Sequence, residues 1–176
     1  ERIGIALVGQ SGNLVPADKK IYALRDVTAT VDSIPLIASS IMSKKLASGA
    51  HSIVLDVKYG SGAFMKDPES AKKLASEMVS IGKSEGRRVS AFITDMDTPL
   101  GRTVGNSIEV LEAISVLRGE GPDDLRSLVI ALSGEMISLA LGMSREEGRK
   151  KAEEMISSRK AYCKFCEWMR AQGADY

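Results

Sequence analysis

The chain has 176 residues, of which 44% are apolar and 27% charged, a composition typical of a globular protein with one medium-sized domain or parts of two. Its formal net charge of +1 excludes a general attraction to nucleic acid or to an anionic membrane, and no apolar run reaches the roughly 20 residues that span a bilayer. With two cysteines, one histidine and no visible secretory signal, it lacks a disulfide framework, and we expect a cytoplasmic protein.

The first predicted element is a strand over residues 2–12, which is apolar and ends in a Gly/Ser turn. The chain begins without Met and enters this apolar run at once, so we expect it to be a piece of a longer protein. Two helices follow over residues 15–31 and 32–49, with no strand between them. Asp32 or Ser33 can cap the second of these helices.

The next elements alternate between strand and helix. Residues 51–62 and 87–97 are predicted strands, and a helix over residues 67–86 lies between them, with Asp67 as its N-cap. Strands separated by helices of this length predict an α/β fold with a partial parallel sheet, flanking helices and right-handed crossovers. The two helices before residue 50 then form a helical excursion from the sheet.

Three predicted helices make up the rest of the chain, over residues 106–121, 122–142 and 144–173. Capping boxes begin two of them: Asn106 with Glu109, and Ser144 with Glu147. The last helix contains a CxxC, Cys163 to Cys166. One cysteine pair without further cysteine or histidine ligands is a poor zinc site, so we interpret these two as ordinary helix residues.

The segment YALRDVTATVDSIPLIASSIMSKK, residues 22–45, places polar side chains among small and aliphatic ones. Helical spacing puts four residues of its second half on one face: Ile37, Ser40, Ile41 and Lys44. An apolar platform with a hydroxyl and an ammonium suits a flat, partly apolar ligand with polar edges, such as a pyrimidine base. Tyr22 and Arg25 could close this slot from the preceding helix. Spacing alone does not decide between this site and a simpler alternative. In that alternative the Lys44 charge interacts favourably with the C-terminal end of the helix dipole, and Ser40 serves only for packing.

Three longer stretches closely resemble the pyrimidine-nucleoside phosphorylase and thymidine phosphorylase family: YALRDVTATVDSIPLIASSIMSKKLASGA, VLDVKYGSGAFMK and TDMDTPLGRTVGNSIEVLEA. The match weakens in the helical tail after Gly142. The resemblance implies a glycosyltransferase that cleaves a pyrimidine nucleoside with phosphate, giving free base and (deoxy)ribose 1-phosphate. It also implies that negative charge builds on the departing base, which a fixed cation stabilises more than it stabilises the neutral substrate.

The resemblance assigns site residues to two groups. Arg25, Ser40 and Lys44 match the family's three polar contacts to the pyrimidine ring, and Arg25 and Lys44 are the expected catalytic cations. Four further residues match positions that line the base pocket: Tyr22, Ile37, Ile41 and Phe64.

The resemblance also implies a domain organisation. Residues 16–49 would belong to a small helical domain, and residues 1–15 and 50–176 to a larger α/β domain. The family holds phosphate with a glycine-rich loop upstream of this region, and no counterpart of that loop is found in the chain. We therefore expect the chain to carry the pyrimidine-binding half of the site and to be inactive alone.

Bacterial members of the family bind a monovalent cation through backbone carbonyls and one glutamate. The matching positions are Leu100, Thr103 and Glu112, which form a candidate potassium site; no other cofactor is expected. The implied partners are a pyrimidine nucleoside or base and phosphate, with a homodimer for the full-length protein and no nucleic acid or membrane.

Two alternatives stay open. One is a related phosphorylase or phosphoribosyltransferase for another base. The other is a non-catalytic dimerisation or binding module, in which the helical excursion serves mainly as a dimer surface.

Overall fold

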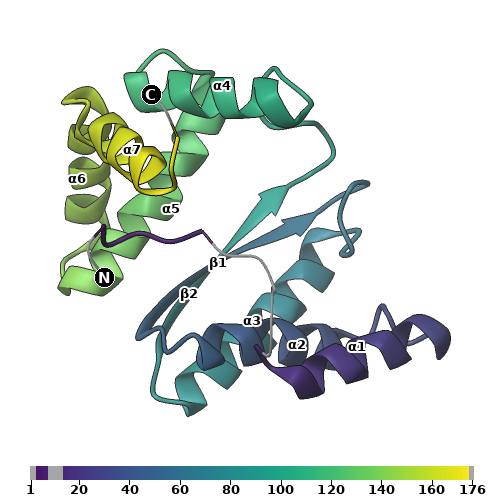
Figure 1. The fold of residues 1–176 in the computed structure, drawn as a ribbon. Coiled ribbons are helices and arrows are strands. Elements are labelled where there is room, and N and C mark those ends of the chain that lie inside the picture. Colours follow the sequence, from purple (N-terminus) through teal and green to yellow (C-terminus); the bar gives the residue numbers. More distant parts are fainter. Residues whose placement is uncertain (1–2, 8–13, 175–176) are drawn as a thin grey trace. The chain divides into compact units, whose positions relative to one another are not determined.

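The structure is a computed structural model of the chain that describes residues 3–7 and 14–174. These residues form seven helices and two strands (Figure 1). Their bounds are α1 Pro16–Val27, α2 Ile34–Ala47, β1 Ser52–Tyr59, α3 Pro68–Ser84, β2 Arg88–Asp95, α4 Asn106–Arg118, α5 Asp123–Leu141, α6 Arg145–Ser157 and α7 Lys160–Ala171. The chain divides into two compact units, Gln10–Thr98 and Glu1–Gly9 with Pro99–Tyr176, which are described one at a time.

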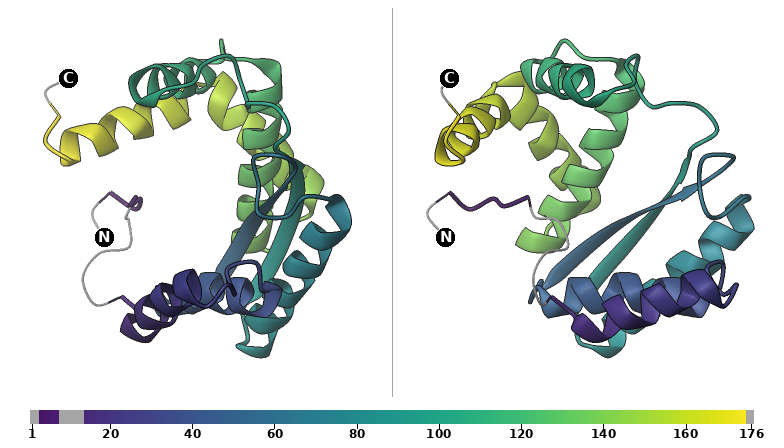
Figure 2. Two further views of the ribbon diagram at one scale, coloured as in Figure 1. Left: turned by 90° about the vertical axis from the view of Figure 1, so that its right-hand side faces the viewer. Right: turned by 45° about the vertical axis from the view of Figure 1, so that its right-hand side comes forward.

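The first unit contains a two-stranded parallel sheet. Ser52 of β1 lies opposite Arg88 of β2, and the register continues to Tyr59 opposite Asp95. α3 connects the two strands and packs on both of them. The expected α/β architecture of a partial parallel sheet with flanking helices is therefore confirmed, and α1 and α2 precede the sheet as neighbouring helices (Figure 2).

Period-two alternation divides the side chains of β1 between two faces of the sheet. Ile53, Leu55 and Val57 are buried, whereas Asp56 between them is exposed. The buried face packs against apolar side chains of α2 and α3. This core consists of Ile37, Ala38, Met42, Ile53, Leu55, Val57, Met65, Ala71, Leu74, Ala75, Met78 and Val89. This core holds α2 against α3 and thereby fixes the directions in which the remaining side chains of α2 point.

Two predicted helix caps are confirmed. Asp67 precedes α3, and its Oδ1 accepts a hydrogen bond from Ser70 N at 2.8 Å. Hydrogen bonds from the Ser70 backbone and hydroxyl hold the pKa of the Asp67 carboxyl below its usual value. Ser144 and Glu147 form the capping box of α6: Ser144 N donates to Glu147 Oε2 at 2.9 Å, and Glu147 N donates to Ser144 Oγ at 3.3 Å.

Two other cap predictions need correction. The N-cap of α4 is Gly105, whose N–H donates to Glu109 Oε1 at 2.9 Å, so Asn106 is the first helical residue and forms no capping box. Ser33 holds the N-cap position of α2, but its side chain makes no capping hydrogen bond. Pro35 follows in the first turn and has no N–H, which removes one of the donors that a cap side chain ordinarily accepts from.

The strand predicted over residues 2–12 is wrong for its described part. Residues 3–7 are not in a strand, and Ile5 and Leu7 are 50% and 78% exposed. A strand requires a hydrogen-bonded partner, and the sheet of the described residues consists of β1 and β2. Residues 2 and 8–12 lie outside the described residues.

The long helix predicted over residues 144–173 is also wrong, because it is two helices, α6 and α7. Arg159 lies between them and has a left-handed backbone with φ 59°. A non-glycine residue in this conformation cannot continue the right-handed helix, so the regular hydrogen-bond ladder stops there.

The second unit contains the four helices α4 to α7, and α5 and α6 pack closely in it. A Cβ added at Gly148 would lie 2.3 Å from Gly134 O, so these two helices approach through glycines. Beside this contact, the buried Glu135 pairs with Arg145 at 2.9 Å. No single helix of the described residues is long and apolar enough to cross a membrane. α5 and α6 meet that criterion only together, with a bend of 119° between them.

Candidate functional site

The polar residues singled out in the sequence lie where α1 contacts α2. Asp18, Tyr22 and Arg25 follow one another at i, i+4 and i+7, so they share one face of α1. Asp18 is 7% exposed and Arg25 is 4% exposed, which is uncommon for charged side chains. Ser40 and Lys44, one turn apart on α2, meet this face.

The guanidinium of Arg25 is held by the segment that follows α1. Its Nε donates to Thr30 O at 3.4 Å, and its Nη2 donates to Val31 O. Its Cζ lies 5.2 Å from the centroid of the Tyr22 ring, within the range of a cation–π contact. Arg25 is therefore fixed in direction by backbone carbonyls on one side and by an aromatic ring on another.

The ammonium of Lys44 is held by two oxygen atoms. Its Nζ donates to Ser40 Oγ at 3.0 Å and forms an ion pair with Asp18 Oδ2 at 2.9 Å. It also lies 6.0 Å from the centroid of the Tyr22 ring. The Lys44 side chain remains 26% exposed, so these groups orient the ammonium without burying the whole side chain.

Asp18 is the member of this cluster that sequence reasoning missed. Burial raises the pKa of its carboxyl, but the neighbouring Lys44 and Ser40 side chains and the positive charges of Lys44 and Arg25 outweigh burial. The pKa of Asp18 therefore lies below its ordinary value of 3.8. The signal was present in the sequence, because Asp18 stands at helical spacing before Tyr22 and Arg25.

The structure thus brings together the four predicted polar and aromatic residues of α1 and α2, although Tyr22 and Lys44 are far apart in the sequence. With Asp18 they form a group of five residues, which we call the base cluster: Asp18, Tyr22, Arg25, Ser40 and Lys44. Two cations and one anion leave this cluster with a net charge of +1. A set of donors with this charge suits a ligand that is neutral or carries one negative charge.

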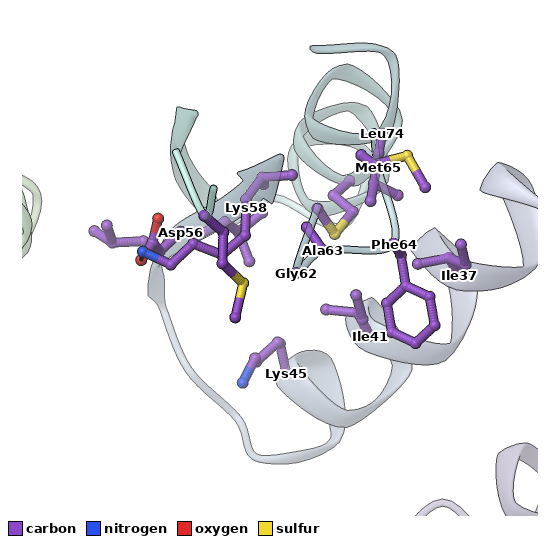
Figure 3. A pocket seen from close by; sticks show the side chains of 15 residues that line it. Ile37, Ile41, Lys45, Asp56, Lys58, Gly62, Ala63, Phe64, Met65 and Leu74 are labelled. Atoms are coloured by element: carbon purple, nitrogen blue, oxygen red, sulfur yellow. Dashed lines mark ion pairs between the residues drawn. The ribbon is translucent and has the colours of Figure 1, made fainter. Parts of the chain in front are cut away.

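The three apolar residues of the prediction gather at a neighbouring cavity of about 490 Å³. Figure 3 shows the Phe64 ring, from the loop after β1, beside Ile37 and Ile41 of α2. Charged groups also line this cavity: Lys45, Asp56 and Lys58, of which the last two form an ion pair at 2.8 Å.

The four predicted residues of α2 lie on one side of the helix, but they have different neighbours. Ser40 and Lys44 meet α1, whereas Ile37 and Ile41 line the cavity with Phe64. Arg25, Ser40 and Lys44 are not among the described residues that line the cavity. Phe64 is 65% exposed, so its ring is open to further contacts.

The loop that carries Phe64 is tied to the end of β2. Ser61 N donates to Asp97 Oδ1 at 2.7 Å, and Asp97 N donates to Asp95 Oδ1 at 2.8 Å. Gly60 has φ +119°, and a Cβ there would lie 2.7 Å from Asp97 Oδ1, so only glycine fits. Asp95 and Asp97 act here as turn-forming carboxylates, which hold the Phe64 loop beside the cavity.

Glu112 of α4 lies against the loop that precedes that helix. Its Oε1 accepts a hydrogen bond from Arg102 N at 3.0 Å, and its Oε2 accepts one from Thr103 Oγ1 at 3.1 Å. A Cβ at Gly101 would lie 2.2 Å from Glu112 Oε2, so glycine permits this approach. Leu100 belongs to the same loop and is 43% exposed. The structure thus brings Thr103 and Glu112 into contact, and a cation at this loop stays a prediction.

The remaining candidate residues do not form a site in the described part of the chain. Cys163 is exposed and Cys166 is buried, both within α7. The exposed His51 has its Nδ1 3.3 Å from Arg87 Nη1. Across residues 3–7 and 14–174, no group of three or more His, Cys, Asp or Glu side chains could hold a metal ion.

Comparison with known proteins identifies the class to which this fold and cluster belong. Residues 1–162 match the glycosyl transferase family, a/b domain. The chain therefore belongs to this family.

Named proteins that are similar to this chain give a more specific comparison than the family does. The pyrimidine-nucleoside phosphorylase of Bacillus subtilis (strain 168) is 57% identical to this chain over 172 residues. The proteins of the same name from Geobacillus stearothermophilus and Staphylococcus aureus (strain bovine RF122 / ET3-1) are each 58% identical over 172 residues. The resemblance inferred from the sequence motifs is confirmed. Each match covers 97% of this chain but 40% of the relative, so the chain spans about 40% of the length of these relatives.

Proposed function

We propose that the chain is the base-binding part of a pyrimidine-nucleoside phosphorylase, an enzyme that converts a pyrimidine nucleoside and phosphate into free base and (deoxy)ribose 1-phosphate. The observation that carries the proposal is the convergence of Arg25, Ser40 and Lys44 beside the Tyr22 ring. Family membership and the names of the relatives support it.

The chemistry of phosphorolysis requires such a cluster. When the glycosidic bond breaks, its electrons remain on the base, so negative charge develops on the pyrimidine while the anomeric carbon becomes electron-poor. Donors fixed beside the base carbonyls interact more strongly with that developing charge than with the neutral substrate, and this difference lowers the barrier. Arg25 and Lys44 are the groups of the base cluster that carry positive charge.

Both cations keep donors for a ligand after their contacts within the protein. Lys44 has three N–H donors, of which one is donated to Ser40, and its ammonium forms the ion pair with Asp18. Arg25 has five N–H donors, and its hydrogen bonds go to the carbonyls of Thr30 and Val31. These contacts fix direction without using every donor, and Lys44, which is 26% exposed whereas Arg25 is 4% exposed, is the more accessible of the two to a carbonyl oxygen of a base.

The apolar residues would pack on the faces of the base. Ile37 and Ile41 share α2 with the polar donors, and Phe64 lies beside them at the cavity. In the whole enzyme we assign residues 16–49 to a small helical domain, and residues 1–15 and 50–176 to a larger α/β domain. Packing of aliphatic and aromatic groups on the base would supply affinity, while the cluster would supply specificity for carbonyl oxygens.

Further properties of the whole enzyme are part of this proposal: a homodimeric, cytoplasmic protein of nucleoside salvage that requires no organic cofactor. A potassium ion would be held by the carbonyls of Leu100 and Thr103 with the Glu112 carboxylate, which already contacts this loop. Carbonyl and carboxylate oxygens are the ligands that such hard cations prefer.

Titration of the 176-residue chain with uracil and with thymine, followed by calorimetry, tests the proposal. We expect both bases to bind, and Lys44→Ala to weaken uracil binding about tenfold or more, because a charge-assisted hydrogen bond is lost. Lys20→Ala is the matched control, since Lys20 is an exposed lysine of α1 outside the cluster. A chain that binds neither base, or that prefers adenine or AMP, would contradict the assignment to pyrimidines.

A dimerisation module is the second candidate, because α1 exposes an apolar face. Ile21, Leu24 and Val27 are 53%, 64% and 81% exposed, at spacings of three residues. Light scattering during the same titrations separates the two functions. A dimer that binds no base would favour the module, whereas base binding favours the enzyme whether or not the chain dimerises.

A further inference from the structure

We propose that Asp18 is a positioning residue of the base site, which orients the Lys44 ammonium and sets the charge of the base cluster. This inference rests on the proposed function, because it concerns the same site. It adds a residue that the sequence motif does not mark, since Asp18 lies before the segment 22–45 that carries the resemblance.

Two contacts restrict the direction of the Lys44 ammonium. Lysine has a four-carbon stem with many rotamers, so an unheld ammonium near the end of a helix samples many directions. Lys44 is instead tied to α1 by the ion pair with Asp18 at 2.9 Å and to its own helix by Ser40 at 3.0 Å. Because Asp18 is 7% exposed, its carboxylate has little freedom to move with the lysine. The pair therefore fixes the ammonium from the protein side.

Asp18 also changes the net charge of the base cluster. Arg25 and Lys44 both lie over the Tyr22 ring, and two like charges in one place repel each other. Asp18 offsets one of them, so the cluster has a net charge of +1 rather than +2. That charge matches the single negative charge that a pyrimidine acquires as it leaves. Without Asp18 the repulsion between the two cations would not be offset.

Base affinity of four forms of the full 176-residue chain tests this inference: wild type, Asp18→Asn, Asp18→Glu and the control Asp26→Asn. Asp26 lies on the same helix but is exposed, so its variant removes a charge without touching the cluster. We expect Asp18→Asn to weaken uracil binding about tenfold or more and Asp26→Asn to leave it unchanged. Asp18→Glu keeps the charge but moves the carboxylate by one methylene, so we expect an intermediate loss of uracil affinity. This variant also tests the inference if Asp18→Asn does not fold.

Thermal unfolding of a double variant shows whether Asp18 acts through Lys44. Lys44→Ala leaves the Asp18 carboxylate buried without its ion-pair partner, which is unfavourable. The variant Asp18→Asn/Lys44→Ala removes that charge as well, so its melting temperature should be higher than that of Lys44→Ala alone. If the decrease in melting temperature of the double variant equals the sum of the decreases of the two single variants, the residues are independent and the inference is wrong.

The outcomes separate this inference from the proposed function. If the wild-type chain does not bind uracil, the proposed function fails, and the positioning role fails with it. If the wild type binds but folded Asp18→Asn and Asp18→Glu bind within twofold of it, only the positioning role is overturned. A lower melting temperature with unchanged uracil affinity would assign Asp18 to structure alone.

Discussion

At the scale of single residues, the base cluster is a set of charges that a packed core would not contain for stability alone. Asp18 and Arg25 are buried between α1 and α2 together with the hydroxyl of Ser40. Taking such groups out of water opposes folding, and their mutual attraction at best roughly offsets that loss. Apolar residues of similar volume would stabilise a helix pair as well or better, so the charges point to a ligand.

Acid titration of Asp18 leads to a prediction at this scale. The pKa of its carboxyl is below 3.8 in the folded protein, so the ionised group stabilises the fold at any pH above 3.8, and this contribution is lost as pH falls through the lowered pKa. Asp18→Asn cannot titrate. The difference in the free energy of unfolding between wild type and Asp18→Asn should therefore be constant at neutral pH and shrink below pH 3.8.

Urea denaturation at a series of pH values measures this difference. Asp67, Asp124 and Glu147 also have lowered pKa values, so wild type and variant both lose stability in acid, and only their difference reports Asp18. A difference that stays the same at pH 6 and well below pH 3.8 would show that folding does not lower the pKa of Asp18.

At the scale of elements, the contact between α5 and α6 depends on two glycines. In a solvent-exposed helix, replacement of glycine by alanine stabilises by up to about 1 kcal/mol. We expect the opposite for Gly148→Ala, because the new Cβ would lie 2.3 Å from Gly134 O and force the helices apart. The free energy of unfolding should fall by about 1–3 kcal/mol, as is typical of an overpacked contact.

The matched control for Gly148→Ala is Lys151→Ala, at an exposed position of the same helix. Chemical denaturation of both variants should show a loss for the first and a change of less than about 0.5 kcal/mol for the second. If Gly148→Ala were as stable as wild type or more so, the close approach of α5 and α6 would not exist in solution.

The ends of the helices and strands show which local sequence signals were sufficient to predict them. Asp67 and the Ser144–Glu147 box lie directly at helix starts, and their hydrogen bonds involve residues within three positions, so the sequence predicted them. The break at Arg159 has no glycine or proline to mark it, and a continuous helix was predicted through it. The strand expected at residues 3–7 has no pairing partner in the described sheet, which an apolar run cannot reveal.

At the scale of the whole molecule, the chain is expected to bind a base without turning over a nucleoside. It spans about 40% of the length of its named relatives. The resemblance implies a phosphate-binding loop upstream of this region. We therefore predict no phosphate-dependent cleavage of thymidine or uridine by the 176-residue chain under conditions in which it binds uracil. Chromatographic detection of free thymine or uracil is the measurement. Cleavage at a rate typical of enzymes, about 1 to 10³ per second, would show that the chain holds a complete active site.

The part of the candidate site that lies on a single helix face could be predicted from the sequence. Ser40 and Lys44 stand one turn apart on α2, and their hydrogen bond follows from that spacing. The convergence of Arg25 and Tyr22 on the same place was a prediction about two helices, and the structure brings them together. The separation of Ile37, Ile41 and Phe64 into a neighbouring cavity was not foreseen, because spacing on one helix cannot show which neighbour each side covers.

The sequence by itself determined the order of strands and helices over most of the chain, two helix caps and the family, because each depends on residues close together in the chain or on a long matching motif. Only the tertiary structure decided that Asp18 joins the base cluster, that α2 divides its polar and apolar residues between α1 and the cavity, and that residues 3–7 are not a strand. The physical reason is that these outcomes depend on how the core packs one element against another, and that packing brings together groups whose separation along the chain carries no local signal.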